Sequence, residues 1–180
     1  MPAAAALLSI EELNALPPSE EQRFSDAVAP LFESAPALTR HLMARKPFAS
    51  YPDLIAAAED VTARALTREE RLAVVNAHPA IGAPPKLLSA LSYAEQGYTR
   101  NPHVDDAEIT ARLQELNRVY ETKYGFRFVE FVNGRPKKDI IPVIEKRLRD
   151  GTVDSELEAG LAEMMKIARN RLTKFDPKEV

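Results

Sequence analysis

Capping pairs and prolines divide this chain into short helical stretches, and that division restricts its possible folds more than any other feature. A Ser or Thr followed three residues later by Glu occurs at Ser9–Glu12, Thr67–Glu70 and Ser92–Glu95. Such pairs form capping boxes at helix starts, because each side chain bonds a backbone N–H group that the first turn leaves free. Prolines such as Pro36 and Pro79 then end or kink the helices. The chain is expected to fold as helices joined by short loops.

Apolar residues at helical spacing extend this pattern along the chain. In the first half of the chain, helices are expected over residues 9–16, over two segments within 19–45 that Pro30 and Pro36 kink or separate, over 54–66 with Asp53 as cap, and over 67–78. In the second half, a short helix opened by Ser92 is followed by one over about 105–125 and one over about 139–150, with Asp139 as cap and Pro142 in the first turn. A last helix, capped by Asp154 or Ser155, runs to about Phe175. Residues 126–132 are predicted to form a buried connector, or at most one strand. The fold class is therefore predicted to be all-α, a single-domain bundle of about eight helices.

Composition excludes several classes of protein. A chain of 180 residues can bury a core of its own, and one domain over residues 1–180 is expected. The net charge is -3 with both signs interspersed, so the concentrated positive surface that nucleic-acid binding needs is missing. There is no cysteine, which excludes disulfides, thiolate metal sites and a cysteine nucleophile.

The two ends of the chain bear on location. The opening segment MPAAAALLSI is too short to span a bilayer, and no Lys or Arg precedes it as in a signal peptide. The final Lys178-Glu179-Val180 is not a peroxisomal signal. A cytoplasmic protein that does not interact with membranes is expected.

Arg171 is the most unusual residue of the last expected helix. At 100° per residue it falls within the apolar stripe of that helix, formed by Leu157, Leu161, Met164, Ala168, Leu172 and Phe175. A guanidinium directed at a core is costly unless acceptors meet it, and its fork suits a carboxylate. Arg171 is therefore a candidate for anion binding. The alternative is an arginine whose stem packs while its head reaches water or a nearby Glu.

His78 lies at the expected end of the helix over 67–78, because Pro79 disfavours helical backbone at the residue before it. Imidazole exchanges a proton near neutral pH, so His78 is a candidate general acid or base. The competing interpretation is a satisfied helix-end residue whose positive charge suits the helix dipole.

Ser92, Glu95 and Gln96 follow within a short interval. A capping box alone would explain the first two, although a helix start also favours anions and could keep Glu95 ionised. The Gln96 amide can both donate and accept. A metal-dependent hydrolase that uses His78, Glu95 and His103 is a further possibility. The chain lacks the H-x-x-x-H and H-E-x-x-H spacings of zinc sites, so no metal is expected.

Four motifs in order carry a family resemblance: HPAIG from His78, SYAEQ from Ser92, ELNRVYETKYGFRF from Glu115 and KIARNRL from Lys166. They resemble the motifs of the 2-oxo-4-hydroxy-4-carboxy-5-ureidoimidazoline (OHCU) decarboxylases of uric acid degradation, over about residues 24–172. The resemblance implies an all-α homodimer that converts OHCU to (S)-allantoin and carbon dioxide with no cofactor.

The same resemblance implies the site. The catalytic residues would be His78, Glu95 and Arg171, the last rather than Arg169 because the family places that arginine directly before a leucine. The substrate would contact Pro79, Ser92, Tyr93, Ala94, Glu95, Gln96, Phe128, Val129, Glu130, Phe131 and Val132. The chain departs from the family at 97–100, where the family often has a turn that ends in Ala-Gly-Leu. The alternative class of function is a non-catalytic helical protein that binds a partner or a small ligand in the same groove.

Overall fold

Helices account for all the regular structure in the part of the chain that the computed structural model describes, which comprises residues 7–33, 35–83, 88–96 and 107–175. The nine α-helices of these residues are α1 Ile10–Ala15, α2 Glu21–Phe32, α3 Pro36–Met43, α4 Tyr51–Asp60, α5 Arg68–Asn76, α6 Ala90–Glu95, α7 Ala107–Tyr124, α8 Lys137–Asp150 and α9 Val153–Leu172. A 3-10 turn at Pro18–Glu20 precedes α2, and a π-helical turn at Val61–Ala65 continues α4. The all-α prediction is confirmed.

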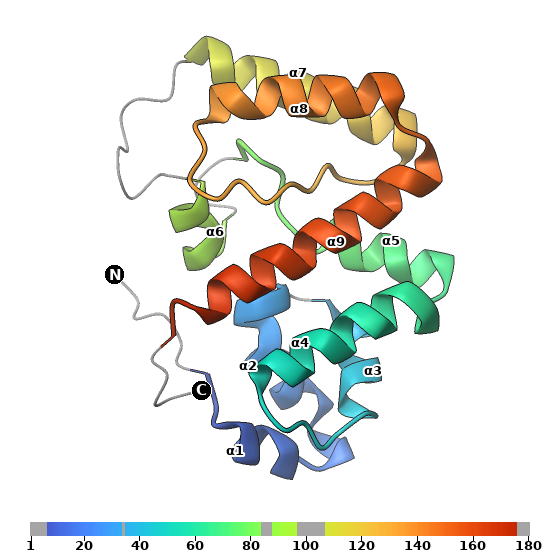
Figure 1. Cartoon of the computed structure of the whole chain (residues 1–180), viewed down its shortest axis with the longest axis vertical. Coiled ribbons are helices and arrows are strands. Elements are labelled where there is room, and N and C mark those ends of the chain that lie inside the picture. Colours follow the sequence, from blue (N-terminus) through green and yellow to red (C-terminus); the bar gives the residue numbers. More distant parts are fainter. Residues whose placement is uncertain (1–6, 34, 84–87, 97–106, 176–180) are drawn as a thin grey trace.

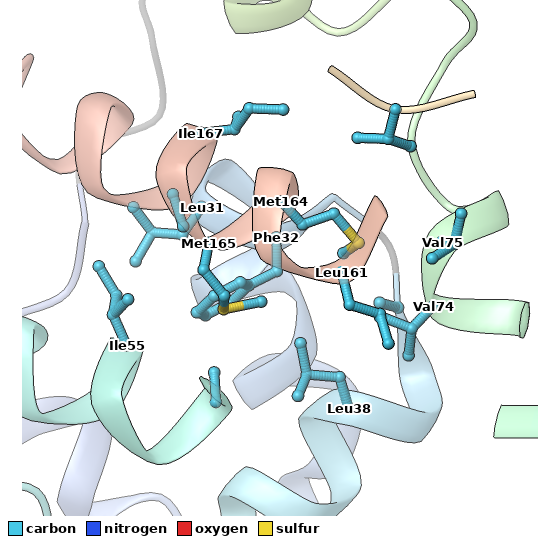
Figure 2. Packing of buried hydrophobic residues seen from close by; sticks show 14 of the residues in the cluster. Leu31, Phe32, Leu38, Ile55, Val74, Val75, Leu161, Met164, Met165 and Ile167 are labelled. Atoms are coloured by element: carbon cyan, nitrogen blue, oxygen red, sulfur yellow. The ribbon is translucent and has the colours of Figure 1, made fainter. Parts of the chain in front are cut away.

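Helix α9 lies between two groups of helices and packs against both. It crosses the centre of the view in Figure 1, with α7 and α8 on one side and α1 to α4 on the other. It packs against α2, α4, α5 and α7. Figure 2 shows side chains of α9 such as Leu161, Met164 and Met165 among those of α2, α4 and α5. Because this face of α9 is buried along its length, α9 fixes Arg171, near its C-terminus, relative to the core.

Two of the three expected capping boxes form. Ser9 with Glu12 opens α1, and Thr67 with Glu70 opens α5. The box expected at Ser92–Glu95 is wrong, because α6 begins three residues earlier with Ser89 as its cap. The Ser89 hydroxyl accepts from the Ser92 backbone N–H group at 3.2 Å. The Ser92 side chain is thereby free to point into the interior.

Three other expected helix starts are also wrong, and each helix begins earlier than predicted. Ser50 caps α4 in place of Asp53, Pro136 precedes α8 in place of Asp139, and Thr152 caps α9 in place of Asp154 or Ser155. The reason at α4 and α9 is that a hydroxyl three residues upstream already accepts the N–H group of Asp53 or Ser155. A polar residue inside the first turn resembles a cap in sequence.

Two helices form within residues 19–45, as predicted, but Pro30 and Pro142 lie inside helices and do not end them. Helix α2 continues through Pro30 to Phe32, so the division from α3 falls after Phe32, and Pro36 lies in the first turn of α3. Pro142 lies inside α8 and not in its first turn. Helix α9 ends at Leu172, short of the expected Phe175.

The segment between α7 and α8 is an extended connector without strand pairing, as predicted. Gly125, with a φ of 84°, ends α7 in the left-handed conformation that glycine adopts most readily. Phe126 and Phe128 then pack edge-to-face against Tyr120 of α7. Figure 1 shows the connector running between α7/α8 and α9. This position puts its backbone beside the candidate site.

Several predictions fall outside the described residues. These are the expected start of a helix at about residue 105, the candidate metal ligand His103 and the unusual turn at 97–100. None of the helices in the described part of the chain is both long enough and apolar enough to pass through a lipid bilayer.

Candidate active site

Four segments that are distant in sequence surround one pocket. They are the residues that follow α5, the short helix α6, the connector after α7 and the C-terminal part of α9. The space between these segments, counted together with its opening to solvent, is about 440 Å³. Its lining residues are His78, Pro79, Ile81, Ser92, Glu95, Gln96, Phe128, Val129, Glu130, Phe131, Val132, Asn133, Ile167 and Arg171.

The imidazole of His78 is buried in the wall of this pocket. Helix α5 ends two residues earlier, and Arg127 of the connector donates to the carbonyl oxygens of Asn76 and His78 at 2.9 and 3.1 Å. The residue is 3% exposed, and within the described residues neither ring nitrogen has a hydrogen-bond partner. The backbone of His78 is therefore fixed, while its two buried ring nitrogens have hydrogen-bonding capacity that no described residue uses.

Burial also keeps the His78 imidazole neutral. Loss of hydration lowers its pKa to about 3, repulsion from Arg171 adds to this effect, and the negative charge of Glu33 opposes it. The interpretation of His78 as a satisfied, charged residue at a helix end is thus wrong. A neutral imidazole has one N–H donor and one acceptor nitrogen, and it can take up a proton.

Arg171 is 1% exposed, so its head does not reach water. Its Nε and Nη2 atoms each donate to one oxygen of Glu95, both at 3.0 Å, in a bidentate pair. Nη2 also donates to Glu33 at 2.7 Å, and Nη1 donates to the carbonyl oxygen of Pro30 at 3.3 Å. Burial opposes the charged form, but Glu95 and Glu33 outweigh it and raise the pKa of Arg171. The buried charge is therefore compensated on two sides.

Glu33 is the main participant that the sequence did not indicate. It follows α2 and accepts from Arg171, from the Ser92 hydroxyl at 2.8 Å and from the Ser89 hydroxyl at 3.0 Å. Burial alone would raise its pKa, but the Arg171 charge and the hydrogen bonds from Ser92 and Arg171 lower it below the ordinary value. Its φ of 58° and ψ of -169° lie in a region that costs residues other than glycine about 1–3 kcal/mol. The unusual φ and ψ of Glu33 distinguish it from other glutamates, and these angles cannot be read from the sequence.

Gln96 holds the loop that follows His78. Its side-chain oxygen accepts from the Gly82 N–H group at 2.9 Å, and its amide nitrogen donates to the Ala80 carbonyl oxygen at 3.3 Å. On the other side of the loop, Asn117 of α7 donates to the Ile81 carbonyl oxygen at 2.9 Å. The loop is therefore clamped between α6 and α7.

A second buried charge network supports the connector. Arg147 of α8 donates to the Val129 carbonyl oxygen at 3.0 Å and to the Glu156 carboxylate at 2.5 Å. The Tyr120 hydroxyl donates to the same carboxylate at 2.7 Å. From α9, Glu163 accepts the Phe131 N–H group at 2.9 Å. The pocket-lining backbone is therefore anchored to two helices, α8 through Arg147 and α9 through Glu163, neither of which was predicted from the sequence.

The structure brings most of the sequence-predicted residues to this pocket. Every predicted catalytic or substrate-contacting residue lines it except Tyr93 and Ala94, and the side chain of Ala94 is exposed on α6. Ile81, Asn133 and Ile167 line the pocket as well, although they were not predicted. Ile81 and Ile167 are almost fully buried, so they add apolar surface to the wall.

Metal binding finds no support among the described side chains. These contain no group of three or more His, Asp or Glu residues placed to hold a metal ion. The hydrolase that was considered would also use His103, which lies outside the described residues. The pocket is lined by a neutral imidazole, a carboxylate–guanidinium pair, a hydroxyl and the connector residues 128–132. This set can bind a small polar ligand and move a proton.

Comparisons of sequence agree on one family. The sequence model of the family described as OHCU decarboxylase matches residues 17–173. The 2-oxo-4-hydroxy-4-carboxy-5-ureidoimidazoline decarboxylase of Haloferax volcanii is 28% identical over 165 residues, which cover 92% of this chain and 94% of that protein. The uric acid degradation bifunctional protein PucL of Bacillus subtilis is 28% identical over 166 residues, which cover 92% of this chain and 32% of that protein.

Solved structures share the fold. A crystal structure of OHCU decarboxylase in the presence of (S)-allantoin matches with a TM-score of 0.66 at 23% identity, over 83% of this chain and 96% of that one. A crystal structure of (S)-allantoin synthase matches with a TM-score of 0.64 at 19% identity, over 94% of this chain and 54% of that one. Because the family match extends over most of the sequence, the chain belongs to the OHCU decarboxylase family.

Proposed function

We propose that this protein decarboxylates OHCU to (S)-allantoin, with His78 as the residue that transfers protons. The observation that carries the proposal is the neutral imidazole of His78, which has no partner in the described structure and shares one pocket with Glu95 and Arg171. Family membership supports the choice of substrate, and relatives bear the name of this activity.

The substrate supplies its own electron sink. In OHCU the carboxylate stands on the ring carbon that also bears the hydroxyl, next to a ring C=N bond. When the C–C bond to the carboxylate breaks, its electron pair forms a C=C bond within the ring and the imine nitrogen takes a proton. The resulting enol then loses its hydroxyl proton and gains a proton on the carbon that bears the ureido group. The products are allantoin and carbon dioxide, with one proton consumed overall, and we expect no cofactor.

His78 is suited to the second stage of this reaction. Its neutral ring can accept the hydroxyl proton and return a proton to one face of the new carbon centre. An anionic substrate beside the ring favours the imidazolium form, so binding raises the pKa of His78 from the value of about 3 in the free protein. Delivery from one side of the ring accounts for a single enantiomer.

The other groups hold the substrate in place. Glu95 accepts from the ureido nitrogens, and Ser92 and Gln96 meet polar edges of the ligand. Arg171 stabilises anionic oxygen through the charge that it keeps beside Glu95. The connector backbone at 128–132 contacts the ring. Positioning and charge stabilisation of this kind lower barriers because the groups are ordered before the substrate arrives.

An assay with freshly generated OHCU tests the proposal. Circular dichroism detects an excess of (S)-allantoin, whereas protonation without face selection gives a racemate and no signal. The wild-type protein should produce the signal, and should do so after treatment with a chelator. His78→Ala should reduce the rate by about 10² to 10⁴, as loss of an acid–base group usually does.

His41→Ala is the matched control. His41 lies in α3, pairs with Glu70 at 3.8 Å and is not among the pocket-lining residues, so its loss should leave turnover unchanged. If the wild-type protein yields no signal above a protein-free blank, the competing function of a passive ligand-binding protein is favoured. Wild-type turnover in His78→Ala would overturn the role of His78 alone.

We further propose that the protein acts as a cytoplasmic homodimer formed by its single domain. The family resemblance supports the dimer, and the lack of cysteine suits a reducing compartment. Light scattering coupled to size-exclusion chromatography should give twice the mass of the 20.0 kDa chain, and a monomeric mass at micromolar concentration would contradict it.

A further inference from the structure

Glu33 stands outside the pocket wall but in contact with it. Its carboxylate accepts from groups of α6 and α9, although it is not itself among the lining residues. Its backbone has a φ of 58°, which side-chain-bearing residues rarely adopt. Such a conformation persists only where surrounding contacts enforce it. The contacts of Glu33 must therefore hold its backbone in this conformation.

One oxygen of Glu33 receives three donors. Arg171 Nη2 lies at 2.7 Å, Ser92 Oγ at 2.8 Å and Ser89 Oγ at 3.0 Å from Oε1. The Glu33 side chain is 13% exposed and that of Arg171 1% exposed, so water screens this contact little. The three donors come from α9, from α6 and from the residue that caps α6. Glu33 thus joins the end of α2 to both helices.

The same contact fixes Glu95, which does line the pocket. Arg171 holds both oxygens of Glu95 through Nε and Nη2, and Glu33 occupies the other side of Nη2. Without Glu33, the guanidinium would keep Glu95, Ser92 and one backbone carbonyl as acceptors and could turn in its plane. Such a rotation would move the Glu95 carboxylate relative to the pocket.

We propose that Glu33 is a positioning residue for the decarboxylation proposed above: it holds the Arg171 guanidinium and the Ser92 hydroxyl so that Glu95 and Ser92 face the substrate. It also contributes the second negative charge beside Arg171. With Lys174 at 3.3 Å from Glu95, the group of Glu33, Glu95, Arg171 and Lys174 carries no net charge. The inference rests on the proposed function, because positioning is defined by that reaction.

The Glu33→Gln variant separates positioning from structural support. Glutamine keeps the length of the side chain and an acceptor oxygen, but it loses the charge. Small displacements of reacting groups reduce turnover strongly, so kcat should fall about 10- to 100-fold. The site gains a net positive charge, which favours an anionic substrate, so KM should stay unchanged or fall. A purely structural role would lower the melting temperature and leave kcat and KM of the folded protein unaltered.

Val28→Ala is the control for stability. Val28 is fully buried in the same helix α2 and is not among the residues that line the pocket. Its truncation should lower the melting temperature while kcat and KM keep their wild-type values. All three proteins are assayed with fresh OHCU at a temperature at which each is folded.

Each outcome decides the proposal. A fall in kcat confined to Glu33→Gln, with KM unchanged or lower, supports it. Wild-type kcat in Glu33→Gln, or an equal fall in both variants, overturns it while the decarboxylase function stands. If the wild-type protein is inactive, both the decarboxylase function and the positioning role of Glu33 are wrong. If Glu33→Gln does not fold, Glu33→Asp takes its place, because aspartate keeps the charge but is one methylene shorter. A fall in kcat of at least tenfold in Glu33→Asp would support the positioning role, and wild-type kcat would overturn it.

Discussion

Burial of His78 couples the stability of the protein to pH. The pKa of its imidazole is about 3 in the folded chain and near 6.5 when exposed. Between these values the unfolded chain binds a proton that the folded chain does not, so stability is full above pH 6.5 and declines as the pH falls through this window. The pKa of the Glu33 carboxyl is also lowered, and it adds to the loss only below its ordinary value of 4.5.

Urea denaturation at pH 7 and pH 5 should expose this coupling. The free energy of unfolding of the wild-type protein should drop by about 2 kcal/mol, given about 1.4 kcal/mol per pH unit below 6.5. His78→Asn should show little of this drop, because it lacks the titrating ring. His41→Asn should keep it, since that side chain is part-exposed. Equal pH dependence in wild type and His78→Asn would contradict the burial of a neutral imidazole.

Two arginines on α9 offer a paired test of buried against exposed charge. Arg171→Met leaves the carboxylates of Glu33 and Glu95 without their main partner, and breaking a buried pair on one side costs about 3–5 kcal/mol. Arg169→Met removes a half-exposed side chain that pairs with Glu59 at 2.5 Å, which is worth about 0–1 kcal/mol.

The two substitutions replace the same residue type two positions apart on one helix, so their effects on helix propensity cancel in the comparison. Urea midpoints measured side by side at pH 7 should differ clearly, with Arg171→Met the less stable. Matching midpoints would mean that Arg171 is not held as the structure shows.

Local sequence patterns single out Arg171 and His78, which line the pocket, but not Glu33, for a physical reason. A charge within an apolar stripe and an imidazole at a helix end are local patterns, visible within a few turns. Glu33 matters because α2 ends where α9 passes, and the two residues of that ion pair are 138 positions apart. Its left-handed backbone is likewise imposed by tertiary contacts, and nothing in the neighbouring sequence specifies it.

At the level of single elements, the cap of α6 bears on both stability and the site. It has six residues, and a helix so short gains too few hydrogen bonds to be stable alone. Five predicted site residues lie on α6 or directly after it, and three of them, Ser92, Glu95 and Gln96, line the pocket. The Ser89 side chain accepts the first-turn N–H group of Ser92 and donates to Glu33.

Ser89→Ala should therefore affect activity as well as stability. Loss of an N-cap costs about 0.5–2 kcal/mol, and here the loosened helix should also lower kcat/KM for OHCU. Ser9→Ala removes the cap of α1, another six-residue helix, which contributes no residue to the pocket. It should cost a similar amount of stability and leave kcat/KM unchanged. Thermal melting and steady-state kinetics are measured on both variants. Equal kcat/KM in the two variants would show that the order of α6 does not affect activity.

The capping rules predicted the starts of α1 and α5 correctly and the start of α6 wrongly. Ser9 and Thr67 lie at helix starts, where their hydroxyls face free N–H groups. Ser92 matches the same spacing to Glu95, but its hydroxyl points inward to Glu33 and the real cap is Ser89. Residue types and spacing fix neither the direction of a side chain nor which of two nearby serines begins the helix.

For the whole molecule, apolar spacing was enough to predict an all-α fold, but not how the helices meet. The connector at 126–132 was predicted as buried, yet its place beside α9 follows from contacts such as Glu163 to the Phe131 N–H group. The convergence of α5, α6, the connector and α9 on one pocket was implied by the family resemblance and by no local pattern.

A pocket built from such distant segments exists only in the folded chain, so a ligand bound there should stabilise the whole molecule. A hundredfold excess of (S)-allantoin over its dissociation constant adds about 2.7 kcal/mol, which corresponds to a rise of about 5–10 °C in melting temperature for a chain of this size. We expect one unfolding transition that moves as a unit in calorimetry. (R)-allantoin at the same concentration should shift it less, because the pocket that protonates one face holds one enantiomer better. Two transitions of which only one moves would show that the pocket lies within a separately folding part, and equal shifts with both enantiomers would contradict selection of one face.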